Sequence, residues 1–66
     1  MSNKFRVEDI EKVEKAFYGM SPKSRNREFN NFNQLVYNHE VTIRTSDILG
    51  LEFMIWLEKK GAVKRI

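Results

Sequence analysis

Residues 48–60 constrain this chain most, because they have the pattern of a helix that is apolar on nearly all sides. A helix turns about 100° per residue, which directs the apolar side chains to two sides: Ile48, Leu51 and Ile55 to one, and Leu49, Phe53, Trp56 and Leu57 to the other. A helix of this kind is normally buried over most of its surface. We therefore expect it at the centre of one small domain spanning residues 1–66, covered by the other elements or by a second copy of the chain.

An apolar stripe at helical spacing predicts a first helix over residues 7–18. The stripe consists of Ile10, Val13 and Phe17. Gly19 follows at a position where helices often end. Glutamates stand four residues before Lys12 and Lys15, which is the favourable order for ion pairs along a helix. We therefore expect these two lysines to be paired.

Ser21 and Pro22 begin a second helix, which we expect to extend to about residue 38. Serine is a good N-cap, and proline is tolerated in the first turn. Helical spacing again defines a core-facing stripe, made of Phe29, Phe32, Leu35 and Val36. This second helix is therefore expected to pack on residues 48–60 through phenylalanine side chains.

Two short strands complete the predicted fold. Residues 41–44 alternate apolar and polar side chains and are β-branched, and residues 62–66 provide a second candidate. The fold class is α+β, in the order helix, helix, strand, helix, strand, with the strands paired as an antiparallel two-stranded ribbon. The side chains expected around the central helix are Ile10, Val13, Phe17, Phe29, Phe32, Leu35 and Val36.

The composition argues against an enzyme. The chain has one histidine, no cysteine and three widely separated glycines, so it lacks a phosphate-binding glycine loop and the ligands of a metal site. We expect no cofactor and no small-molecule substrate. No apolar run approaches the roughly 20 residues of a membrane span. The lack of cysteines is typical of intracellular domains, and we expect a cytoplasmic protein.

The second helix has an unusual polar face. Lys23, Arg25 and Arg27 lie near its N-terminus, where the helix dipole favours acidic residues. Several asparagines follow, although asparagine is a poor helix former; those on the candidate binding face are Asn26, Asn30 and Asn33. Lysine and arginine bind phosphates, and asparagine can read adenine edges. The face is therefore a candidate for a DNA groove, with a protein interface and a solvated face without function as alternatives.

A second basic cluster lies at the end of the sequence. Lys64 and Arg65 are candidate phosphate contacts, with Arg44 nearby if the two strands pair. Large apolar side chains support a rival hypothesis, in which the protein is a small inhibitor or adaptor that docks on another protein or on a second copy. Its anchors would be Phe53, Trp56 and Tyr37, since aromatic residues dominate interface hot spots.

The last third of the chain resembles winged-helix DNA-binding regulators. The sequence LEKKGAVKRI at residues 57–66 is similar to the junction between a recognition helix and the first wing strand, and TSDILG at residues 45–50 is similar to the short positioning helix. The sequence ends at Ile66, before a second wing strand, and the recognition helix over residues 51–57 is mostly apolar. The resemblance implies a small DNA-binding regulator whose contacts would come from residues 22–38 or from the C-terminal basic cluster. Our leading hypothesis is a nucleic-acid-binding regulator that forms a dimer.

Overall fold

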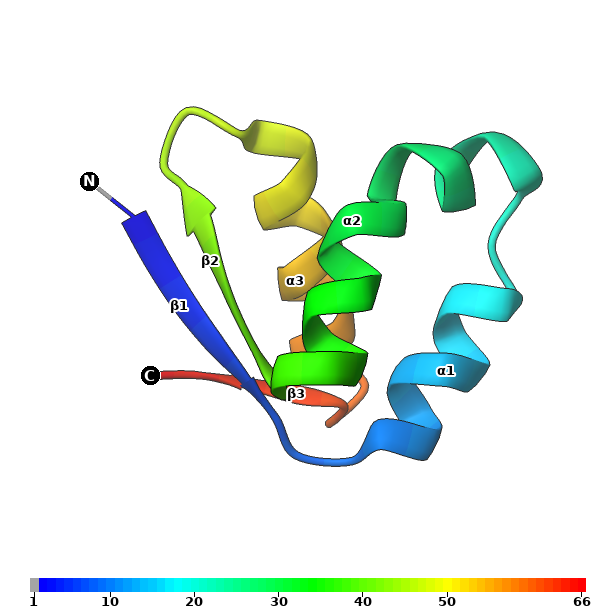
Figure 1. Cartoon of the computed structure of the whole chain (residues 1–66), viewed down its shortest axis with the longest axis horizontal. Coiled ribbons are helices and arrows are strands. Elements are labelled where there is room, and N and C mark those ends of the chain that lie inside the picture. Colours follow the sequence, from blue (N-terminus) through cyan, green and yellow to red (C-terminus); the bar gives the residue numbers. More distant parts are fainter. Residues whose placement is uncertain (1) are drawn as a thin grey trace.

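The structure, a computed structural model, describes residues 2–66. It is a small α+β domain in which three helices lie on one side of a three-stranded antiparallel sheet (Figure 1). The elements are β1 (Ser2–Val7), α1 (Ile10–Tyr18), α2 (Pro22–Asn38), β2 (Glu40–Arg44), α3 (Ile48–Lys59) and β3 (Val63–Arg65). The α+β class is confirmed, and so is the predicted order of helices and strands after residue 9.

The predicted two-stranded ribbon is wrong, because an N-terminal strand separates the two expected strands. The strand order is β2-β1-β3, and β1 pairs antiparallel with both neighbours. Phe5 of β1 lies opposite Val41 on one side and opposite Arg65 on the other. A lone two-stranded ribbon is marginally stable in water, and the third strand removes that weakness. As a consequence, Arg44 lies on the opposite edge of the sheet from β3.

Side-chain caps explain where the helices begin. The carboxylate of Asp9 accepts hydrogen bonds from the backbone of Glu11 and Lys12, so α1 starts at Ile10 rather than at residue 7. Ser21 and Asp47 cap α2 and α3 in the same way. Caps of this kind satisfy backbone N–H groups that have no partner inside the helix.

The core lies between the sheet and the helices. Phe5 of β1 is fully buried, and Phe17 of α1 stacks on Phe32 of α2 with ring centroids 3.8 Å apart. The predicted side chains Val13, Phe17, Phe32 and Leu35 are buried, while Ile10 and Val36 are partly buried against the core. Phe29 is a correction, because 52% of its surface is exposed on the flank of α2.

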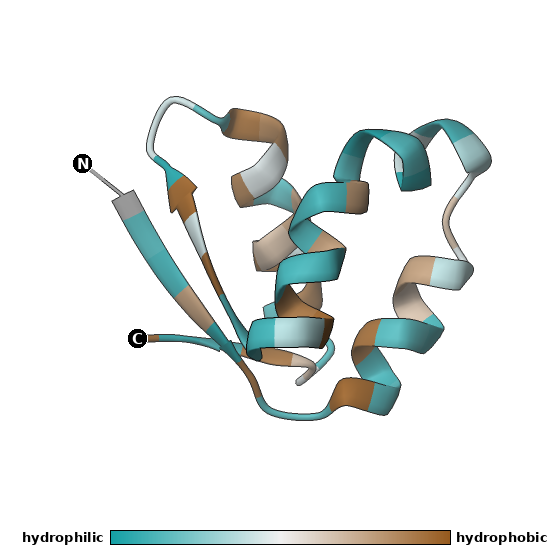
Figure 2. Ribbon diagram, in the orientation of Figure 1, coloured by the Kyte–Doolittle hydropathy of each residue, from teal (hydrophilic) through white to brown (hydrophobic). Residues whose placement is uncertain are grey.

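The other elements of the chain do not cover α3 on all of its sides, so the first of the two expected arrangements is wrong. Its buried residues are Gly50, Phe53, Met54 and Leu57, and these face the sheet and the other helices. A different set of large apolar side chains is exposed: Ile48, Leu49, Ile55 and Trp56. Figure 2 shows that α3 carries strongly hydrophobic residues, whereas α2 is largely hydrophilic. The helix is therefore a wall of the core that presents an apolar surface to solvent.

Candidate nucleic-acid interface

The outer side of α2 carries five of the residues that the sequence singled out. Their spacing of three and four residues places them along one side of the helix; we call them the α2 strip, consisting of Lys23, Asn26, Asn30, Asn33 and Tyr37. Asn33 is half-buried and the other four are exposed. The strip holds a single cation.

Arg25 points away from the strip and joins α2 to α1. Its guanidinium donates hydrogen bonds to the backbone carbonyls of Tyr18, at 3.1 Å, and Met20, at 3.2 Å. The Tyr18 carbonyl lies in the last turn of α1, where the helix cannot satisfy it itself, and the Met20 carbonyl lies in the turn that follows. Arg25 therefore holds the turn between the two helices, and this role competes with phosphate binding.

Arg27 is paired with a buried carboxylate. Its Nε lies 3.1 Å from Oε2 of Glu28, whose side chain is almost fully buried, and Asn31 donates to the other oxygen at 3.0 Å. A buried carboxylate without partners is strongly destabilising, so both contacts are needed by the fold. The basic N-terminus of α2 thus offers Lys23 as the cation with no partner among the described residues.

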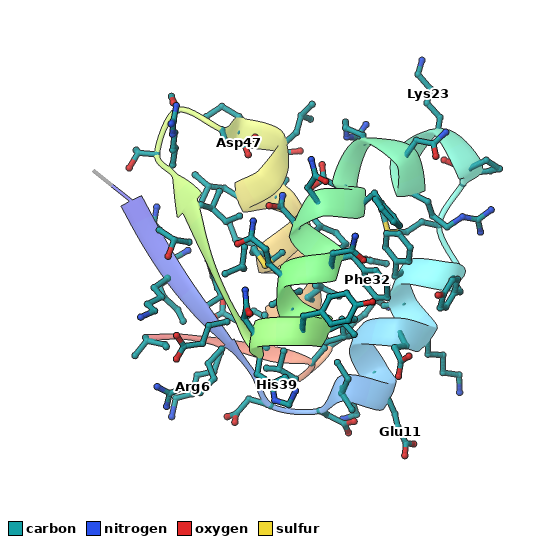
Figure 3. The ribbon with its side chains drawn as sticks, viewed as in Figure 1. Arg6, Glu11, Lys23, Phe32, His39 and Asp47 are labelled. Carbon is teal, nitrogen blue, oxygen red and sulfur yellow. The ribbon has the colours of Figure 1, made fainter. Side chains whose placement is uncertain are left out.

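The outer face of the sheet has a different character, because no helix covers it (Figure 1). Alternation along the strands turns Phe5, Val41 and Ile43 to the core and turns their neighbours outward. We call this surface the open sheet face; its described side chains are Lys4, Arg6, Glu40, Thr42, Arg44 and Lys64. Figure 3 places Arg6 on the side of the strand away from the helices.

The open sheet face is strongly basic. It carries four cations against one carboxylate, a surplus equal to the net charge of +3 of the whole chain. The carboxylate of Glu40 lies 3.2 Å from the ammonium of Lys4 and 3.2 Å from the guanidinium of Arg6. Hydrogen bonds from these two side chains lower the pKa of the Glu40 carboxyl, and the bond from Lys4 has the larger effect. Arg6 also lies directly opposite Lys64 across β1 and β3. Like charges in such a pair are unfavourable to a sheet.

The two C-terminal candidates face opposite sides of β3. Lys64 belongs to the open sheet face, as its pairing with Arg6 requires. Arg65 turns to the other side, where its guanidinium lies 4.9 Å from the ring of Phe5 and donates to the side chain of Asn3 at 3.0 Å. Lys23 lies at the far end of the molecule from Arg6 (Figure 3). The structure therefore does not bring Lys23 close to Lys64, which pairs with Arg6.

The three aromatic residues proposed as protein anchors lie in different environments. Phe53 is buried in the core and contacts Trp56 with ring centroids 6.3 Å apart. Trp56 itself is 38% exposed, and Tyr37 on α2 is largely exposed. Of these three residues, Trp56 is the one that both contacts the core, through Phe53, and remains accessible to a partner.

The segments that resemble a winged-helix domain have a simple local structure. Residues 48–50 of the expected positioning helix and residues 51–57 of the expected recognition helix belong to the uninterrupted helix α3. Residues 63–65 form β3, which pairs with β1. The exposed side of α3 carries Glu52 and Lys59 beside its exposed apolar side chains.

Comparisons with protein-family models, with curated proteins and with solved structures find no match to this chain. Within residues 2–66, no group of three or more histidine or acidic side chains is placed to hold a metal ion. The same residues include no helix with the length and apolar character needed to cross a membrane.

Proposed function

We propose that this protein is a small regulatory DNA-binding protein that holds the phosphate backbone on its open sheet face. The observation that supports this most is the concentration of the chain's positive surplus on one helix-free surface. Clustered lysine and arginine side chains bind phosphates and release the counterions that surround a duplex. Flexible lysine and arginine side chains on a flat surface can bind phosphates without a deep groove.

A simpler explanation for charged strands is protection against edge-to-edge aggregation. That explanation fits Arg44 and Lys64, which lie on the edge strands β2 and β3. It does not fit Lys4 and Arg6, because β1 is the central strand and both of its edges are paired. Half of the cations on the open sheet face therefore have no role in edge protection, which supports a role in binding.

Phosphate contacts position a protein on DNA, whereas base contacts provide sequence specificity. The described side chains of the open sheet face include no amide and no aromatic group that would read or stack on bases. The asparagines of the α2 strip belong to a helix that lies on the opposite side of the sheet from the open sheet face (Figure 1). The proposed binding mode is therefore largely independent of sequence.

Binding to duplex DNA is expected to fall steeply with salt. With about three phosphates neutralised, the slope of log K against log salt is about −2.7, so affinity drops roughly 40-fold between 50 and 200 mM. Fluorescence anisotropy with two labelled 20-base-pair duplexes of unrelated sequence measures this. Similar affinities are expected for the two duplexes. Absence of binding at 50 mM salt, or a strong preference for one duplex, would contradict the proposal.

A further inference from the structure

A groove with Trp56 at its centre runs between α3 and the two preceding helices, away from the open sheet face. It consists of two hollows that both have Trp56 in their lining. The first, of about 410 Å³, is lined by Lys12, Lys15, Ala16, Gly19, Trp56 and Lys60. The second, of about 260 Å³, is lined by Met20, Arg27, Leu49, Glu52, Phe53 and Trp56. We call the two together the Trp56 groove.

The first hollow is cationic, with three lysines and no acidic residue along its lining. The ammonium of Lys60 lies 4.7 Å from the centre of the Trp56 ring. The expected ion pairs of Lys12 and Lys15 do not form within 4.0 Å, and among the described residues none of the three lysines has an acidic partner at that distance. Glu8 precedes the start of α1, which removes the helical spacing that would have paired it with Lys12. The three amines are therefore available to an external carboxylate.

The second hollow is mainly apolar and is built on the core. Phe53 forms part of its wall and is buried, while Leu49 and Trp56 keep 48% and 38% of their surface exposed. Grooves of this type take apolar side chains from a partner helix or peptide. The apolar second hollow lies beside the unpaired lysines of the first, so a matching ligand carries both apolar and acidic side chains.

We propose that the Trp56 groove binds an acidic, amphipathic segment of a partner protein. Carboxylates of that segment contact Lys12, Lys15 and Lys60, and its apolar side chains pack on Trp56 and Leu49. The interaction is separate from DNA binding, since none of these residues belongs to the open sheet face. The protein would then link a duplex to an acidic partner.

Charge selects this occupant over two others. A nucleic-acid backbone matches the lysines, but it has no apolar side chains to pack on Leu49 and Trp56 in the second hollow. A second copy of this chain carries a net charge of +3, which opposes its approach to a cationic hollow. An acidic amphipathic segment complements both halves of the groove.

Two soluble polymers distinguish the contributions of charge and apolar contact. The probe is a random copolymer of glutamate and tyrosine, and polyglutamate of equal length is the charge-only comparator. Trp56 is the single tryptophan of the chain, so its emission reports occupation of the groove directly. We expect the copolymer to shift the emission of Trp56 and to bind at least about 10-fold more tightly than polyglutamate at 100 mM salt.

Two variants with the same change in net charge test the location. The groove variant Lys12→Gln/Lys15→Gln/Lys60→Gln is expected to lose at least about 10-fold in copolymer affinity and to keep its DNA affinity within about twofold. The sheet variant Lys4→Gln/Arg44→Gln/Lys64→Gln is expected to behave in the opposite way. Equal losses of copolymer affinity in both variants, or equal binding of the two polymers, would overturn the proposal. So would a Trp56 emission that shifts with protein concentration alone, which would assign the groove to a second copy.

Discussion

Replacing Phe5 with alanine is expected to lower the free energy of unfolding by about 3–5 kcal/mol, the usual cost of emptying a buried phenylalanine site. The side chain is completely buried and lies on the central strand, where it contacts the core that all three helices share. A single core of this size rarely supplies more than about 3–5 kcal/mol in total. The variant should therefore be largely unfolded at room temperature.

Phe29→Ala is the matched control, because it removes the same side chain from the flank of α2, where half of it is exposed. We expect a loss of no more than about 1 kcal/mol there, since little apolar surface is taken from the core. Urea unfolding followed by far-ultraviolet circular dichroism measures both values. Similar losses for the two variants would show that β1 does not form the centre of the sheet.

The second large effect concerns DNA affinity. The sheet variant Lys4→Gln/Arg44→Gln/Lys64→Gln leaves the Arg6–Glu40 ion pair in place and removes the surplus charge of the open sheet face. Three lost phosphate contacts are expected to reduce affinity at 50 mM salt by more than about 100-fold and to flatten the salt dependence. Fluorescence anisotropy with the labelled duplexes measures both quantities, and the circular dichroism spectrum should remain that of the wild type.

The groove variant is the control for net charge. Both variants lower the formal charge of the chain from +3 to zero, yet the groove variant leaves the open sheet face intact. Its DNA affinity should stay close to that of the wild type. If both variants lose affinity equally, DNA binding depends on overall charge, and the open sheet face has no special role.

The helices were predictable because their signals are local. A capping side chain directly precedes the first residue of each helix. Pro22 marks the start of α2 and Gly61 follows the end of α3, and the spacing of apolar residues indicates the same boundaries. Gly61 adopts a φ of +76°, which side chains other than glycine rarely accept. The predicted order of elements after residue 9 followed from these signals.

Strand β1 was missed because its evidence is not local. The run Lys4-Phe5-Arg6-Val7 alternates polar and apolar side chains, but it is short. Its partners in β2 and β3 lie more than 30 residues away along the chain. Whether so short a run becomes a strand depends on that distant pairing, which composition cannot reveal.

The same omission hid the candidate site. Of the predicted phosphate contacts, Lys64 belongs to the open sheet face, whereas Arg25 and Arg27 bind carbonyls and a carboxylate of the protein itself. The sequence showed a basic helix terminus, but it did not show that contacts within the protein occupy two of its three cations. Lys4 and Arg6 could have been found by treating residues 4–7 as a strand, since alternation then places both on one face.

Chemical-shift mapping of the ¹⁵N-labelled protein during titration with a 20-base-pair duplex tests the central claim most directly, because it locates the bound DNA residue by residue. The claim is that the open sheet face, and not the α2 strip, contacts the phosphates. We predict that the largest shifts fall in β1 around Lys4 and Arg6, with neighbouring shifts at Arg44 and Lys64. Largest shifts along the α2 strip, from Lys23 to Tyr37, would contradict the claim.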